Sequence, residues 1–98
     1  MTEAGPDLRV VTGESLQLVR AIAPTGTVIP MHQHEAEQVT FIVEGKIEVV
    51  IGDETYSAAA GDVVVVPGNV PHEFRIIERM VAVEAVSPLR PELIPSAK

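Results

Sequence analysis

The chain has 98 residues, of which 14 are acidic and 7 are basic, and its formal net charge is −7 at pH 7. This charge disfavours binding to nucleic acid or to an anionic membrane, because phosphates and acidic lipids would meet no positive patch. The sequence holds no cysteine, which excludes disulfides, thiolate metal sites and cysteine nucleophiles. No signal-peptide pattern opens the chain and no apolar run is long enough to span a bilayer, so we expect one cytoplasmic domain.

Turn residues recur along the chain, and short segments rich in Val, Ile and Thr lie between them. The turn signals fall at residues 13, 24–26, 44–45, 52–53, 61–62 and 67–69. The intervening segments predict strands over residues 15–23, 27–34, 38–44, 46–51, 54–58, 62–66, 72–77 and 80–86. Eight short strands with a turn at about every tenth residue predict an antiparallel sandwich or barrel.

The core must be built from small aliphatic side chains, because the chain has one Tyr, two Phe and no Trp. Residues 63–66 are four consecutive valines. This segment does not alternate between apolar and polar residues, so we expect it to be covered on both faces, by the opposite sheet and by a partner chain. A small core and an apolar strand of this kind favour a homodimer.

The expected organisation is a single domain over residues 1–98. Residues 1–13 form an N-terminal extension, residues 14–86 form the barrel and residues 87–98 form a C-terminal arm. The three prolines of the arm exclude a central strand or a long helix. The arm therefore either packs over the barrel or a neighbouring subunit, or is a loose end.

The three histidines of the chain are His32, His34 and His72. His32 and His34 are two apart in an extended segment, so both imidazoles lie on one face of a strand. His72 begins another predicted strand, and inward residues of separate strands meet inside a closed barrel. Without further signals these histidines could equally be surface or hydrogen-bonded core residues.

Their spacing resembles the two sequence motifs of the cupin superfamily. The first reads Gly26, five residues, His32-x-His34, three residues, Gln38, six residues and Gly45. The second reads Gly61, five residues, Pro67-x-Asn69, two residues, His72 and then Ile76. The resemblance implies an all-β, single-domain cupin, a jelly-roll barrel or sandwich, with one divalent metal ion on His32, His34, Gln38 and His72.

This chain departs from the cupin motifs at three positions. Asn69 replaces a Gly, and Asn tolerates the positive φ that such a turn needs. Ile76 replaces an Asn that is not a ligand. Gln38 replaces the usual Glu, so three imidazoles and one amide leave the full charge on the metal and strengthen it as a Lewis acid. The ligand set suits Zn, Ni, Fe, Mn or Co. A bulge that turned Glu37 inward in place of Gln38 is the alternative.

A narrower resemblance is to the small unsaturated-uronate cupins of pectin and alginate degradation, which also use Gln as the fourth ligand. It rests on residues 37–45, on Val70-Pro71-His72 and on residues 86–90. Those proteins open a 4,5-unsaturated uronic acid to its linear keto form without redox chemistry. Their catalytic Arg is matched by Arg90. Glu84 stands where they have an Asp, and Val86 stands where they have a Phe, which predicts a wider and less aromatic pocket.

The resemblance implies catalytic roles for Glu84 as an acid or base and for Arg90 as the receptor of a substrate carboxylate. The structural alternative is a rim ion pair between them, which contributes little. The favoured function is a redox-neutral isomerase, lyase or cyclase acting on a carbonyl-bearing small molecule, and the cupin-type polyketide cyclases are similar as well. The alternatives are a dioxygenase that uses the metal and O2, and a non-enzymatic module that binds a small ligand.

Overall fold

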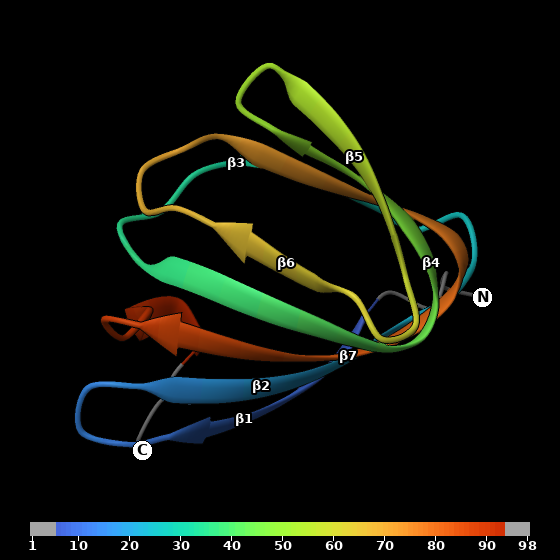
Figure 1. Ribbon diagram of the computed structural model, residues 1–98. Helices are drawn as coiled ribbons and strands as arrows, with labels where there is room; N and C mark the ends of the chain where they lie inside the picture. Colours follow the sequence, from blue (N-terminus) through green and yellow to red (C-terminus); the bar gives the residue numbers. More distant parts are fainter. Residues whose placement is uncertain (1–5, 94–98) are drawn as a thin grey trace, which may run out of the picture.

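The computed structural model describes residues 6–93, and over this range the chain is built from strands (Figure 1). The strands are β1 (Asp7–Thr12), β2 (Gln17–Ala23), β3 (Val28–His32), β4 (Glu37–Ile51), β5 (Glu54–Ala59), β6 (Val63–Val66) and β7 (His72–Ser87), followed by a 3-10 helical turn η1 (Pro91–Leu93). Every pairing between them is antiparallel. The all-β prediction is confirmed. Within the described residues, no helix is long and apolar enough to cross a membrane.

The two long strands, β4 and β7, organise the barrel. The strand order is β1-β2-β7-β4-β5, with β3 paired to β7 and β6 paired to β4. Strands β4 and β7 are antiparallel, so the start of β4 pairs with the end of β7. The pairing continues along both strands to Ile51 of β4 and His72 of β7. Both strands bend on the way, so the sheet curves around one interior (Figure 1).

The predicted turn at Glu44-Gly45 is wrong, because β4 runs through it without a break. The register between β4 and β7 shifts three times between Ile42 and Ile47, which marks an irregular bulge. Gly45 has φ +100°, and a Cβ atom there would collide with the carbonyl of Arg79. Glycine therefore lets the strand bend against its neighbour, which is the role that a bulge glycine has in a barrel corner.

The N-terminal boundary of the barrel also differs from the prediction. Residues 7–12 were expected to lie in an extension, but they form β1 and pair with β2. Asp7 is opposite Ile22 at one end of this pairing, and Thr12 is opposite Gln17 at the other. Leu8 and Val10 share one side of this edge strand, where Val10 is partly buried, whereas Leu8 and Val11 are exposed.

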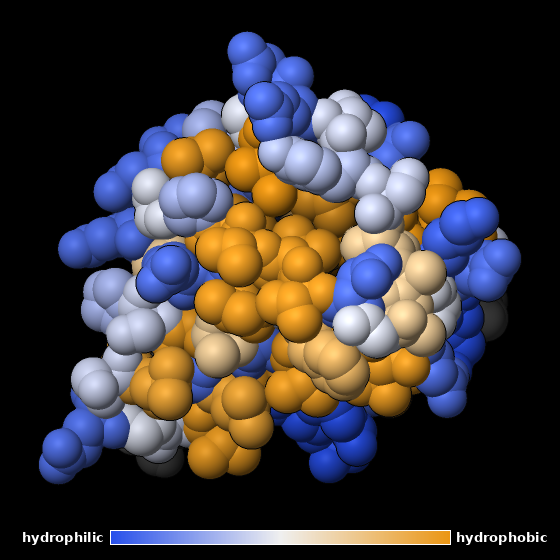
Figure 2. Space-filling view, viewed as in Figure 1, coloured by the Kyte–Doolittle hydropathy of each residue, from blue (hydrophilic) through white to orange (hydrophobic). Residues whose placement is uncertain are grey.

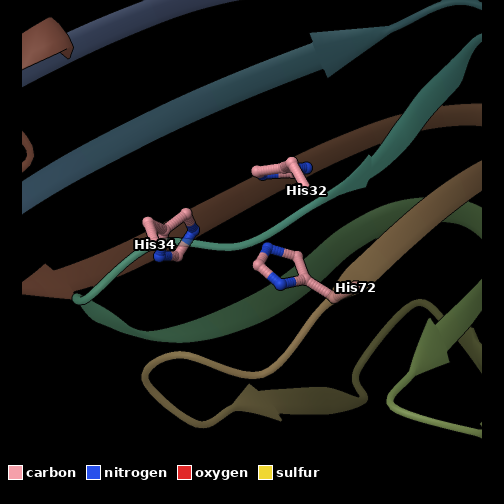
Figure 3. Close-up of side chains that lie close together, drawn as sticks. All are labelled: His32, His34 and His72. Atoms are coloured by element: carbon pink, nitrogen blue, oxygen red, sulfur yellow. The ribbon is translucent and has the colours of Figure 1, made fainter.

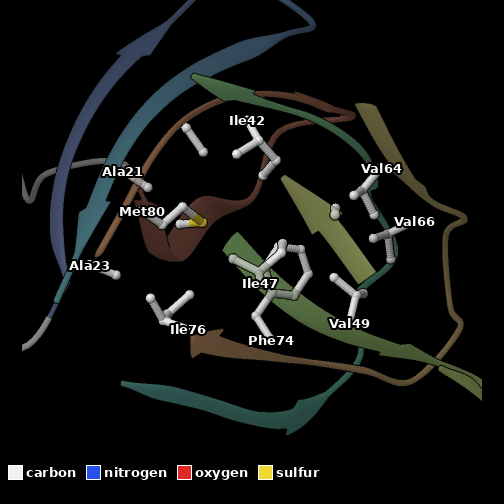
Figure 4. Packing of buried hydrophobic residues seen from close by; sticks show 12 residues of the cluster. Ala21, Ala23, Ile42, Ile47, Val49, Val64, Val66, Phe74, Ile76 and Met80 are labelled. Atoms are coloured by element: carbon white, nitrogen blue, oxygen red, sulfur yellow. The ribbon is translucent and has the colours of Figure 1, made fainter. Parts of the chain in front are cut away.

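The interior is lined by small aliphatic side chains and one Phe (Figure 4). The main cluster consists of Ala21, Ala23, Ile42, Ile47, Val49, Ala58, Val64, Val66, Phe74, Ile76, Met80 and Ala82. The alternation of strand residues explains this selection, because successive side chains point to opposite faces.

Within the single chain, residues 63–66 are covered on one face, and the expected cover by a partner chain stays a prediction. Val64 and Val66 point into the core, whereas Val63 and Val65 are 56% and 51% exposed. Strand β6 pairs with β4 at the border of the sheet, so only its inner side is covered. Figure 2 shows apolar side chains gathered on the outer face of this region. Its exposed members on β4 and β6 are Val39, Phe41, Val43, Val63 and Val65.

The described part of the C-terminal arm packs over the end of the barrel. The side chain of Gln17 holds the backbone of Arg90, because its Oε1 accepts from the Arg90 N–H at 2.8 Å and its Nε2 donates to the Arg90 carbonyl at 3.2 Å. Leu93 contacts a second apolar cluster, formed by Val19, Ala36 and Val86. The rest of the predicted arm, residues 94–98, lies outside the described residues.

Candidate metal centre

Three elements bring the histidines together at one end of the barrel. His32 ends β3, His34 lies in the loop that follows, and His72 begins β7. One ring nitrogen of each lies within 4.8 Å of those of the other two, and the rings face one another (Figure 3). The ring centroids are 4.3 Å apart for His32 and His72, which are also partners in the β3–β7 register. The expected convergence of the three histidines is therefore present.

The backbone orients each imidazole with its Nε2 toward the others. Each Nδ1 forms a hydrogen bond to the carbonyl oxygen two residues away along the chain, at 2.9 Å for His32, 2.8 Å for His34 and 2.9 Å for His72. A proton on Nδ1 leaves Nε2 with a free lone pair. The Nε2 atoms of His34 and His72 are buried and have no hydrogen-bond partner. Buried polar atoms of this kind are rare, and this arrangement is the one that metal-binding histidines adopt.

Burial favours the neutral form of two of these imidazoles. It lowers the pKa of His72, against the opposing hydrogen bond to Val70, and the neighbouring His32 and His34 and the charge of Arg90 lower it further. Burial also lowers the pKa of His34, and Arg90 adds to the shift. A divalent ion requires neutral imidazole ligands, so both shifts prepare the cluster to bind one.

Gln38 lies beside the histidine cluster, on the inner face of β4. It is 4% exposed, and its Nε2 donates to Oε1 of Glu84 at 2.8 Å and to Oγ1 of Thr40 at 3.1 Å. Because the amide nitrogen of Gln38 is committed to Glu84 and Thr40, the amide oxygen takes no part in these two bonds. Glu37 is exposed, as expected for the adjacent strand position, so its carboxylate lies on the opposite side of β4 from the cluster.

Glu84 reaches the site from β7 and is held by its neighbours on β4. Its Oε1 accepts from Gln38 and from Oγ1 of Thr40, the latter at 3.2 Å. Burial raises the pKa of Glu84, whereas the hydrogen bond from Thr40 and the charge of Arg90 act in the opposite direction. Thr40 was not among the expected site residues. The sequence does hold an indication of its role, because Thr40 is two residues after Gln38. In a strand, this spacing places both side chains on the same face.

Arg90 does not pair with Glu84. Its Nε donates to Oε2 of Glu92 at 2.8 Å, so the alternative interpretation, a rim ion pair between Glu84 and Arg90, is wrong. The guanidinium still lies close enough to His34, His72 and Glu84 to lower the pKa of each. Four further N–H donors of the guanidinium are not needed for the bond to Glu92, so Arg90 could also contact an anion in the pocket.

A pocket of about 180 Å³ adjoins the histidines. Its described lining consists of Pro6, Leu8, Ala21, Ala23, Ile29, His32, Gln38, His72, Phe74, Met80, Glu84, Arg90 and Leu93. Val86 is absent from this set, because it is fully buried against Val19 and Ala36. The expectation that Val86 widens the pocket is therefore wrong, whereas Phe74 supplies an aromatic ring from the other end of β7.

Comparison with known families agrees with this arrangement. The family model described as "Cupin domain" matches residues 18–86. The chain belongs to the cupin family. Among solved structures, KdgF from a Halomonas species is 27% identical with a TM-score of 0.86, over 96% of this chain and 90% of that one. This similarity is consistent with the narrower resemblance to the unsaturated-uronate cupins. An oxalate decarboxylase from Bacillus subtilis, whose manganese centres were studied, is 21% identical with a TM-score of 0.83 over 93% of this chain and 28% of that one, and shows the same fold.

The similarity covers only part of the curated relatives. Quercetin 2,3-dioxygenase of Bacillus subtilis is 27% identical over 66 residues, which are 66% of this chain and 20% of that protein. An uncharacterized protein of Streptomyces coelicolor, SCO3923, is 38% identical over 52 residues, which are 53% of this chain and 50% of that protein. The chain thus spans half or less of the length of these two relatives.

Proposed function

We propose that this cupin binds one divalent metal ion through His32, His34, His72 and the amide oxygen of Gln38, and that it catalyses a redox-neutral reaction of a small carbonyl compound. The observation that carries the metal site is the pair of buried, unpartnered Nε2 atoms on His34 and His72. Both face a third imidazole and a carboxamide that is already oriented by Glu84. A neutral ligand set of this kind suits Zn, Ni, Fe, Mn or Co.

The bound ion would supply Lewis acidity toward a carbonyl or enol oxygen. The chain supplies the proton transfer, since Glu84 lines the pocket between the ligand Gln38 and the apolar interior. As a carboxylate, Glu84 accepts a proton from the carbon next to the carbonyl, and it returns the same proton to another atom of the substrate. Proton and electron pair are conserved, which gives an isomerisation, an elimination or a ring closure. Arg90 orients a substrate carboxylate with its remaining N–H groups.

A dioxygenase is the second candidate, because quercetin 2,3-dioxygenase is among the similar proteins. The two functions differ in whether the metal must change oxidation state. We expect the Zn(II) form, which has no redox chemistry, to retain turnover, with no O2 consumed. An inert Zn(II) form, together with an Fe(II) form that consumes O2 in step with substrate, would replace the isomerase with the dioxygenase.

The role of Glu84 is tested by Glu84→Gln, which keeps the shape of the side chain and removes its basicity. A positioned acid–base group typically contributes about 10²- to 10⁴-fold to the rate, so turnover should fall by that order while the metal content is unchanged. Glu37→Gln is the matched control, because it makes the same change on the exposed side of β4. Turnover that survives in Glu84→Gln would assign the proton transfer to another group. Metal binding without turnover of any carbonyl substrate would favour a ligand-binding module.

A further inference from the structure

The lining of the pocket separates polar and apolar residues along the strands. On β3, His32 belongs to the histidine cluster. Ile29, three residues earlier on the same strand, also lines the pocket. On β7, His72 is followed by Phe74, which faces Ile29 across the register. The five polar lining side chains are His32, Gln38, His72, Glu84 and Arg90, and all of them belong to the candidate metal centre.

The second half of β7 repeats this polarity from the other side. Glu84 is preceded on the same face by Ala82 and Met80. These two pair with Ala21 and Ala23 of β2. Beyond Glu84, the side chains that face the interior on β2 and β7 are therefore alanines and a methionine. Figure 4 shows Ala21, Ala23 and Met80 around the same interior as Phe74. The backbone groups of these strands are occupied by the pairing between β2 and β7.

From this polarity we propose that the substrate is a small oxo acid with a short apolar chain or a single ring, and not a polyhydroxylated sugar acid. The inference rests on the proposed function, because it takes the metal centre and Arg90 as the receptors of the carbonyl and carboxylate oxygens. The rest of the molecule then lies against Ile29, Phe74 and Met80. Each sugar hydroxyl buried there would lose its bonds to water and find no described side chain to replace them, which lowers affinity about tenfold or more.

The size of the pocket sets a limit on the apolar part. Its volume of about 180 Å³ is below the roughly 300 Å³ at which pockets for drug-sized ligands begin. The site therefore suits one short chain or one ring, rather than a fused ring system. Each additional CH2 group that enters the apolar part should raise the affinity about fourfold, until the space is filled.

The test is calorimetric titration of the Zn(II)-loaded protein with a series of unbranched 2-oxo acids from four to seven carbons, and with glucuronate. We expect the affinity to rise about fourfold per CH2 along the series, and glucuronate to bind at least tenfold more weakly than the best member. An affinity that does not change with chain length, or glucuronate binding as tightly as the best 2-oxo acid, would overturn the inference.

A pair of variants places the contact in this pocket. Ile29→Thr puts a hydroxyl into the apolar part and should flatten the dependence on chain length, whereas Val28→Thr makes a similar change at an exposed position on the opposite side of β3 and should preserve it. Equal effects of the two variants would contradict the assignment. A Zn(II) titration of the ligand-free protein comes first. Failure to bind Zn(II) would overturn the proposed metal site, and this inference with it, whereas Zn(II) binding with a flat series would overturn this inference alone.

Discussion

The hydrogen bond from Gln38 to Glu84 makes a quantitative prediction about metal affinity. Because Gln38 is 4% exposed, replacing Glu84 with Leu leaves a buried N–H group whose remaining partner is Thr40. An unsatisfied buried donor costs about 1–3 kcal/mol, and Gln38 can recover this only by rotating its amide oxygen away from the cluster. Residues that hold a metal ligand in place typically contribute 10- to 100-fold in affinity, which corresponds to about 1.4–2.8 kcal/mol. We therefore expect Glu84→Leu to weaken Zn(II) binding by 10- to 100-fold.

The assay is competition for Zn(II) against a chromophoric chelator at pH 7.5, with circular dichroism to confirm that each variant is folded. Glu84→Gln separates the hydrogen bond from the charge, because its side-chain oxygen still accepts from Gln38 while the carboxylate is lost. We expect it to bind Zn(II) more tightly than Glu84→Leu does. Glu37→Leu, on the exposed side of the strand, should bind as the wild type does. Wild-type affinity in Glu84→Leu, or an equal loss in Glu84→Gln, would refute the argument that this hydrogen bond orients the ligand.

Three further predictions concern the histidines, Gly45 and the exposed apolar face around Phe41. Because the pKa values of His34 and His72 are lowered in the folded protein, the unfolded chain binds protons more readily than the folded one. The stability of the metal-free protein should therefore fall as pH drops below about 6.5 and level off below the lowered pKa values. A melting temperature that does not change between pH 7.5 and 5.5 would contradict this. Gly45→Ala should lower the free energy of unfolding by about 2–4 kcal/mol, because it combines a positive φ with a collision against the neighbouring backbone. Gly26→Ala has a positive φ but open space around it, so it should lower the free energy of unfolding by only about 1–2 kcal/mol. Equal losses of stability in chemical denaturation would contradict the bulge interpretation. The exposed apolar face around Phe41 favours a homodimer. Light scattering at micromolar concentration should therefore give twice the chain mass for the wild type and a lower mass for Phe41→Asp. A wild-type mass equal to one chain would rule the dimer out.

The fold class could be predicted because it depends on local patterns. Alternating residues and regular turns indicate strands wherever they occur in the chain. The set of three histidines was instead indicated by the resemblance to the cupin motifs, because His34 lies in the loop after β3 and His72 begins a different strand.

The errors arose where a long-range contact decides the structure. Gly45 carries a turn signal, but its conformation serves the approach of Arg79 from another part of the chain. The position of Val86 followed from a motif comparison, whereas its burial depends on Val19 and Ala36. The bond between Gln38 and Glu84 joins residues 46 positions apart, so no local pattern could indicate it.

The most direct test of this account is the metal content of the purified chain. The protein is stripped with a chelator, loaded with Zn(II), desalted and measured by mass spectrometry under native conditions, beside His72→Ala and Gln33→Ala. Gln33→Ala is the matched control, because Gln33 lies between His32 and His34 but is exposed. We predict one ion per chain in the wild type and in Gln33→Ala, and loss of the ion in His72→Ala. A wild type without bound Zn(II), or a His72→Ala variant that retains one ion per chain, would contradict the assignment of the three histidines as a metal centre.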